Sequence, residues 1–460
     1  MLVKKLSVIS YVILLIASVI TSLMIDKLAI MVLPLVLLIV IYMSFNVKNL
    51  VYILILFMPC IEILNQYGVG FSIGNFQLMT NSLVSSFFII IAFLYLFKKN
   101  FEIRVYPSLF FTILAYISLG LISTLLATEK IFSIKEEIKL IFYFLLVLII
   151  PFVVNNEFDK KRVIEFFIAS SIIPLAVGGL QFLTNSSPIE TYLDGRMVIR
   201  ITGGFTHSNH FAYYISMVGI VLFTQLLSNE RASFYKSKMI LFIVIGLELF
   251  LTYSRTALIM YIFVMIFILF FKKMDKMVFL FPVALMLLIL FVNFGSNSSS
   301  LIEDRFSGIL DIFSSGSYIQ DAVNNNYSDS FGWRIYLWSK VLALLVDNNL
   351  VFGFGLQNFN FVANQAIGIY IDAHNTFVKV LVEMGIVGFL AFVGFVIQMF
   401  VVYFKSKKGN LNLHISSSIY VYFYIILVSF VDPVFSHNVI GFYIWLFVGI
   451  QGALLQKKLN

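Results

Sequence analysis

Five arginines lie in or beside the polar stretches that interrupt this otherwise apolar chain: Arg196, Arg200, Arg255, Arg305 and Arg334. Arginine suits phosphate well, because its planar guanidinium donates two parallel hydrogen bonds and stays charged. Arginines on separate stretches can bind one anion where the fold brings them together. Their positions therefore predict an anion site, and several arginines together could bind a diphosphate.

Arg255 is the sharpest case among these arginines. It lies in Leu251–Leu258, a turn with almost no loop between two apolar segments. An arginine so close to hydrocarbon is costly unless it is paired or lines a wet cavity. Ser254 and Thr256 place polar groups at a helix N-terminus, where free N–H groups attract anions. The alternative is a snorkelling arginine that only marks the interface.

Two histidines stand near the start of an apolar segment in the stretch Arg200–His210. His207 and His210 are three residues apart, which can suit a metal, but no carboxylate or third histidine lies nearby in sequence. We therefore expect no metal here. Asn209 is expected to cap the helix that follows.

His374 stands at the start of another apolar segment. Histidine can take a proton from a hydroxyl near neutral pH. Asp372 is expected to orient the imidazole and Asn375 to cap the helix, while Gly385 and Gly388 would let a second helix approach closely. Taken alone, His374 is also compatible with an ordinary interfacial residue.

Other titratable groups show no pattern of chemistry. His414 and His437 are interpreted as loop residues near interfaces, and Glu62 and Glu248 as isolated acidic groups within apolar segments. The single cysteine, Cys60, excludes an intramolecular disulfide.

The elements that must position these residues are membrane helices. Hydrophobic residues make up 61% of the 460 residues and charged residues 12%, against about 45–50% and about 25% in soluble domains. Such a chain could not cover its own surface in water, which excludes a soluble enzyme and a disordered protein. We predict an all-α polytopic membrane protein of about 12–14 transmembrane helices, built from the segments 6–24, 28–44, 50–64, 77–97, 108–127, 138–154, 163–183, 209–227, 239–253, 256–271, 277–294, 376–404, 413–431 and 438–456.

Basic residues orient these helices. With fourteen helices and both termini in the cytoplasm, 20 of the 31 lysines and arginines fall on the cytoplasmic side. The net charge of +8 is thereby explained without nucleic acid. This topology leaves two sizeable segments on the extracytoplasmic side of the membrane, residues 184–208 and 295–375.

The segment 295–375 is predicted to be a large extracytoplasmic loop within a single membrane domain, 1–460. Residues 296–330 are rich in Ser, Asn, Asp and Gly and are expected to be loosely ordered. Residues 333–346 are mostly apolar but too short to span, so a helix on the membrane surface is expected there. Arginines, a histidine and an apolar surround on the outer face predict transfer of a sugar from a lipid diphosphate to a hydroxyl.

From about residue 185 to 390, the chain resembles the O-antigen ligase/polymerase superfamily of bacterial membrane glycosyltransferases. The similar motifs are the Arg200–Asn209 stretch with its Gly-Phe-x-His-x-Asn core, Thr-x-Ser-Arg at 252–255, Gly332-Trp-Arg-Ile-x-x-Trp338, Gly353-x-Gly355, and His374-Asn375 followed by Glu383-x-Gly385-x-x-Gly388. Ser208 departs from the proline common in the family, whose members often have nearer twelve helices.

The resemblance implies a GT-C-like fold and metal-independent, inverting transfer from an undecaprenyl-diphosphate-linked glycan. The implied place is the outer face of the bacterial cytoplasmic membrane. Carried over by position, Arg200 and Arg255, with Arg196, would hold the diphosphate. Arg334, in the large outer loop, would assist catalysis, and His374 would activate the acceptor hydroxyl.

His207, Asn209, Asp372 and Asn375 are expected to support this site, and neither a metal nor a cofactor is expected. The expected partners are the lipid-linked donor, an acceptor glycan or glycolipid, the bilayer, a chain-length regulator and a flippase. Nucleic acid is not expected among them.

Several activities remain open. We favour a polymerase that joins repeat units, since nothing in the sequence demonstrates the outer-membrane acceptor that a ligase needs. A ligase to lipid A core, a protein O-oligosaccharyltransferase, and a flippase or other transporter are the alternatives. A transporter usually shows internal repeats and broken helices at mid-membrane, which this sequence does not suggest.

Overall fold

The computed structural model describes residues 46–66, 70–73, 76–186, 190–193, 196–227, 235–272, 318–325, 330–407 and 416–459. The predicted segments 6–24, 28–44 and 277–294 lie outside the described residues, as do Arg305 and most of 296–330.

Helices dominate the described chain. They are α3 (Val47–Gln66), α4 (Thr80–Lys98), α5 (Pro107–Leu126), α6 (Lys130–Val153), α7 (Glu157–Ala169), α8 (Ile172–Thr184), α9 (Ser208–Leu226), α10 (Tyr235–Leu251), α11 (Arg255–Lys272), α14 (Tyr318–Val323), α15 (Ser330–Asn348), α16 (Phe359–Ile367), α17 (Thr376–Lys407), α18 (Ser416–Ser429), the 3-10 turn η2 (Val434–Ser436) and α19 (Asn438–Leu459). Each predicted apolar segment among the described residues is mainly helical. Segment 163–183 is divided between α7 and α8, with a break at Ser170 and Ser171.

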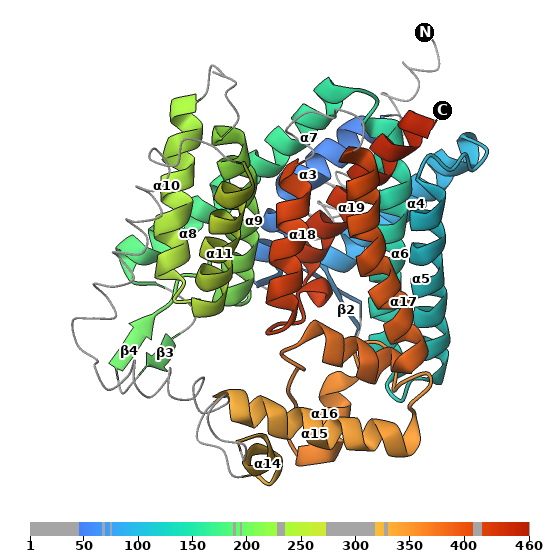
Figure 1. Ribbon diagram of the computed structural model, residues 1–460, viewed down its shortest axis with the longest axis vertical. Coiled ribbons are helices and arrows are strands. Elements are labelled where there is room, and N and C mark those ends of the chain that lie inside the picture. The colour runs from blue at the N-terminus through green and yellow to red at the C-terminus, as the bar shows by residue number, and fades with distance from the viewer. Residues whose placement is uncertain are drawn as a thin grey trace, which may run out of the picture.

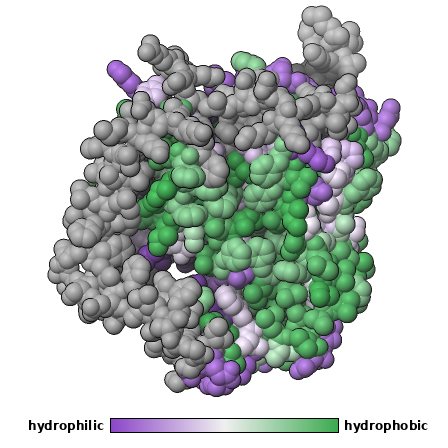
Figure 2. Space-filling view, viewed as in Figure 1, coloured by the Kyte–Doolittle hydropathy of each residue, from purple (hydrophilic) through white to green (hydrophobic). Residues whose placement is uncertain are grey.

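Within the described residues, five helical stretches are long and apolar enough to cross a membrane: Val47–Asn65, Thr80–Lys98, Pro107–Leu126, Phe158–Thr184 and Thr376–Lys405. Shorter apolar helices occur as well. On the face in Figure 2, hydrophobic residues cover the middle of the described surface and hydrophilic ones gather near its upper and lower edges. The prediction of an all-α, multi-pass membrane protein is confirmed.

The centre of the bundle is formed by α6 and α19, with α17 packed against α5 and α9 against α10, α11 and α18. The Trp445 ring lies between those of Tyr143 and Phe395, with ring centroids 6.0 and 4.7 Å away. Membrane helices associate through such close packing rather than through expulsion of water. The bundle is therefore a firm scaffold for the loops at its ends.

Two short antiparallel hairpins join helices. They are β1 (Gly70–Ile73) with β2 (Phe76–Met79), and β3 (Glu190–Leu193) with β4 (Arg196–Ile199). Neither was predicted, because four-residue strands are too short to show a period of two beside long apolar segments.

Helices α15 and α16 lie together at one end of the bundle (Figure 1). A small separate core holds them to the start of α17; its members include Leu337, Val341, Phe359, Ala373 and Val382. The helix predicted at 333–346 is present as the longer α15, and its place on the membrane surface stays a prediction.

Helix α17 is kinked at Gly385, which has φ 66° and ψ −171°. The kink opens the α17 backbone to the segment 350–355: Ile386 N–H donates to Leu350 O at 2.9 Å, and Phe354 N–H donates to Val382 O at 3.0 Å. A Cβ on Gly385 would collide with Val351 O. Gly385 thus admits a loop, where the sequence had suggested a second helix.

Candidate active site

His374 lies in the loop that leads into α17, in a left-handed backbone conformation with φ 49°. Such a conformation is unfavourable for a residue other than glycine and persists where the surroundings enforce it. The next two residues supply that constraint. Asn375 accepts from Val378 N–H at 3.0 Å, which caps α17, and donates to Phe430 O at 3.0 Å; Thr376 donates to Asp432 O at 2.9 Å.

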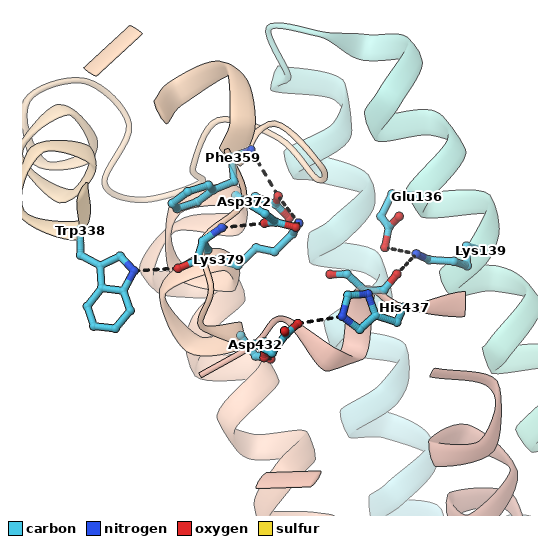
Figure 3. A network of polar contacts seen from close by, with 12 residues as sticks. Glu136, Lys139, Trp338, Phe359, Asp372, Lys379, Asp432 and His437 are labelled. Carbon is cyan, nitrogen blue, oxygen red and sulfur yellow. Dashed lines mark hydrogen bonds and ion pairs between the residues drawn. The ribbon is translucent and has the colours of Figure 1, made fainter. Parts of the chain in front are cut away.

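Asp372 does not orient His374 through a hydrogen bond among those described. Its carboxylate accepts from Lys379 Nζ at 2.8 and 3.0 Å and from Ala373 N–H at 2.7 Å (Figure 3). Lys379 is buried on α17, and its ammonium also lies 3.7 Å from a Glu383 oxygen. A buried charge needs such partners, so Asp372 and Lys379 fix the loop around His374.

Helix α15 closes the other side of this loop. Trp338 Nε1 donates to Ala373 O at 2.7 Å (Figure 3). The Trp333 and His374 rings meet edge to face, with their centroids 6.4 Å apart. Arg334, on the same helix, is close enough for its charge to act on His374. The motif around Arg334 and the motif around His374 therefore meet in space.

Arg200 joins the second stretch to the Arg255 turn. Its Nε–H donates to Thr252 O at 2.9 Å, and a terminal N–H donates to Asn209 Oδ1 at 2.8 Å. Asn209 therefore holds Arg200, where a helix cap was expected. The cap of α9 is His207, whose Nδ1 accepts from Asn209 N–H at 3.1 Å.

The other two predicted arginines sit at the edges of this region. Arg255 is the first residue of α11, three positions after Thr252, and is half-buried. Arg196 begins β4, opposite Leu193 in the hairpin. Arg200 is thus tied directly to the turn that carries Arg255, while Arg196 lies at the end of β4 next to the hairpin turn.

Charge interactions place His207 among the residues of the other stretches. Burial lowers its pKa, Arg200 lowers it further, and the remaining charged groups that act on it are Asp432, His437 and His374. Residues 200, 207, 334 and 374 therefore surround one polar region.

Burial also sets the protonation of His374. Desolvation lowers the pKa of His374, and the Arg334 charge lowers it further, against smaller opposing effects of Asp432 and Asp372. Burial likewise lowers the pKa of Arg334 and of Arg200, though arginine stays protonated in proteins. The site thus combines a neutral imidazole with partly desolvated cations.

The loop between α18 and α19 brings residues that the sequence analysis missed. Asp432 Oδ1 accepts from His437 Nε2 at 2.8 Å, and Asp432 Oδ2 accepts from Tyr213 OH at 3.2 Å. The His437 ring also packs against the His210 ring, with centroids 3.6 Å apart and the ring planes tilted by 38°. The predicted fourteen-helix topology puts residues 432–437 on the outer side, the same side as His374. This was the signal in the sequence that could have pointed to Asp432 and His437.

The pKa of Asp432 is lowered on balance. Burial alone would raise this pKa, but the His437 hydrogen bond and the charges of His437, His210 and His374 outweigh it. Asp432 therefore supplies a negative charge to a region otherwise lined by arginines and histidines.

Residues 239–393 match the family model described as O-antigen ligase. The matched segment contains Arg255, Arg334, Asp372, His374 and Asn375, and it runs from α10 into α17. The comparison with curated proteins finds no match. The match confirms the resemblance to the O-antigen ligase/polymerase superfamily that the motifs indicated.

Proposed function

We propose, from the O-antigen ligase family match of residues 239–393 and the meeting of Arg200, Arg334 and His374, that this chain is a polysaccharide polymerase. It joins undecaprenyl-diphosphate-linked oligosaccharide repeat units on the outer face of the cytoplasmic membrane. The juxtaposition of arginines from separate segments around one half-buried imidazole, that of His374, carries the proposal.

The arginines hold the donor diphosphate. Arg200 and Arg334 reach the polar region from the segment before α9 and from α15, while Arg255 enters at the N-terminus of α11, whose free N–H groups favour an anion. Arg196 begins β4 and is proposed to assist in binding the diphosphate. In a partly desolvated site these charges act strongly on the charge that develops on the leaving diphosphate.

His374 activates the acceptor. The acceptor hydroxyl oxygen attacks the anomeric carbon of the donor sugar while the bond from that carbon to the diphosphate oxygen breaks. The bonding electron pair leaves with the diphosphate, and the hydroxyl proton passes to the free imidazole nitrogen of His374. Attack opposite the leaving group inverts the anomeric centre, and the step needs neither a metal nor a cofactor.

A ligase is the second candidate, and one observation favours it: the matching family model carries the description O-antigen ligase. The same residues would then pass finished polymer to lipid A core. A protein acceptor requires no further change in the chemistry. These activities differ in the acceptor that enters beside His374.

The test presents different acceptors to one purified protein. In proteoliposomes supplied with an undecaprenyl-diphosphate repeat unit alone, a ladder of products is expected and identifies a polymerase. Product formed only when lipid A core is added would replace the polymerase by the ligase. The absence of product with the repeat unit, lipid A core and an acceptor protein would contradict glycosyl transfer and leave a flippase or other transporter.

The same assay in a chelator tests metal independence. An unchanged ladder is expected, because the proton and the leaving group are handled by His374 and the arginines. Loss of transfer in chelator, followed by recovery with a divalent ion, would contradict this part of the proposal.

A further inference from the structure

We propose that His210, Asp432 and His437 bind a divalent transition-metal ion such as Zn²⁺. One possible ligand atom from each side chain lies within 4.8 Å of the other two. His210 comes from the first turn of α9, and the other two come from the loop between α18 and α19. Metal binding is proposed independently of the transfer chemistry, which uses His374 and the arginines, although the Asp432 charge also acts on His374.

The donor set fits such an ion. Zn²⁺ is bound by imidazole nitrogens at about 2.0–2.1 Å and by carboxylate oxygens at about 2.0–2.2 Å, often with a water as the last ligand. Ligand atoms around a tetrahedral Zn²⁺ are therefore about 3.4 Å apart. The 2.8 Å hydrogen bond from His437 Nε2 to Asp432 Oδ1 opens slightly on binding, and its proton leaves to solvent.

Neighbouring hydroxyl groups occupy the other polar atom of Asp432 and of His210, which leaves one atom of each side chain for the metal. Tyr213 donates to Asp432 Oδ2, so Oδ1 faces His437. Thr206 donates to Glu62 Oε1 at 3.3 Å, and its oxygen lies 3.3 Å from His210 Nδ1. With its proton on Nδ1, His210 keeps Nε2 as the ligand atom. Metal-binding histidines commonly have such a partner on the other nitrogen.

The backbone also holds the ligands in place before an ion arrives. Asp432 is 7% exposed, and its carbonyl accepts from Thr376 Oγ1 and from Val434 N–H, both at 2.9 Å. His437 N–H donates to Val434 O at 3.3 Å. An ion here would tie the α18–α19 loop to the start of α9.

The test measures metal binding rather than transfer. Full-length protein is purified in detergent without a polyhistidine tag, stripped with a chelator and titrated with Zn²⁺ by calorimetry. One saturable Zn²⁺ per chain is expected, with a higher unfolding temperature in its presence, because a ligand that binds the folded state stabilises it. His210→Gln and His437→Gln should each weaken binding by roughly 10- to 100-fold or more.

His414→Gln is the matched control, since it removes a histidine elsewhere in the chain, and it should bind Zn²⁺ as the wild type does. Unchanged affinity in both ligand variants, or no saturable binding by the wild type, would overturn the proposal. Circular dichroism checks that each variant is folded. Should one glutamine variant fail to fold, the other and Asp432→Asn carry the same test.

Discussion

At the scale of single residues, the candidate site depends on arginines that neighbouring oxygens hold in place. Arg200 donates to the Thr252 carbonyl and to the Asn209 amide oxygen. These hydrogen bonds hold its guanidinium beside His207, whose pKa responds to both Arg200 and His374. Arg104, by contrast, lies on the surface with its guanidinium 2.8 Å from Glu102.

We therefore expect Arg200→Ala to lower kcat/KM of transfer by about 10²- to 10³-fold, the usual loss when a group that stabilises developing negative charge is removed. Arg104→Ala is the control and should leave the rate nearly unchanged. Initial rates of product formation in proteoliposomes measure both. A normal rate for Arg200→Ala would remove this residue from the diphosphate site.

The pH dependence follows from His374. A base must be neutral to accept a proton, and burial together with Arg334 lowers the pKa of His374 below its usual 6.5. The neutral form therefore persists as the pH falls through 6.5, and the rate should decline only below that value. A kcat/KM profile measures this limb, and Arg334→Met should move it to higher pH because it removes one lowering charge. An acid limb above 6.5 in the wild type would contradict the assignment.

At the scale of elements, the segment 350–355 and the kink of α17 lock together through backbone hydrogen bonds. A Cβ on Gly353 would lie 2.5 Å from the Glu383 backbone, while Gly394, farther along α17, has nothing within 4 Å of such a Cβ. A glycine in contact with another backbone segment and a glycine with open space around it should therefore differ in how much an alanine substitution lowers stability.

Gly385→Ala is expected to lower the unfolding temperature. The Gly385 backbone, with φ 66° and ψ −171°, lies in a region that essentially only glycine adopts and that costs about 1–3 kcal/mol for a residue with a Cβ. The contact with Val351 O adds to this cost. Gly394→Ala should cause no loss, because alanine is favoured over glycine inside a helix. Thermal unfolding in detergent measures the pair; equal stability of the two variants would show that the lock is unimportant.

The helices and the meeting of the motifs could be predicted from the sequence, but the partners within the site could not. Apolar segments are a property of local composition, so they predict helices directly, and the described helices agree with them. The Lys/Arg bias is likewise a local property, and it predicts the orientation of these helices. The pairing of Asp372 with Lys379, the cap by His207 and the Asp432–His437 bond depend on side-chain directions. Asp432 and His437 are distant in sequence from His374, so spacing alone carried no signal for them.

At the scale of the whole molecule, the topology predicted from the lysine and arginine distribution puts the candidate site outside the cytoplasmic membrane and both termini inside. The single Cys60 makes this testable after Cys60→Ser. Asn349→Cys, at an exposed position after α15, should react with a membrane-impermeant maleimide in intact cells. Asn100→Cys, at an exposed position after α4, should react only after permeabilisation. The reverse labelling would invert the predicted topology.

His374 is the one residue assigned to take the acceptor proton, so the proposed transfer depends most heavily on it. The direct measurement is product formation from an undecaprenyl-diphosphate repeat unit in proteoliposomes of the wild type, His374→Ala and His414→Ala. We expect the His374→Ala rate to fall by at least about 10²-fold, the usual contribution of a positioned base, while the folded protein and the His414→Ala rate remain as in the wild type. Wild-type rates for folded His374→Ala would contradict the central claim.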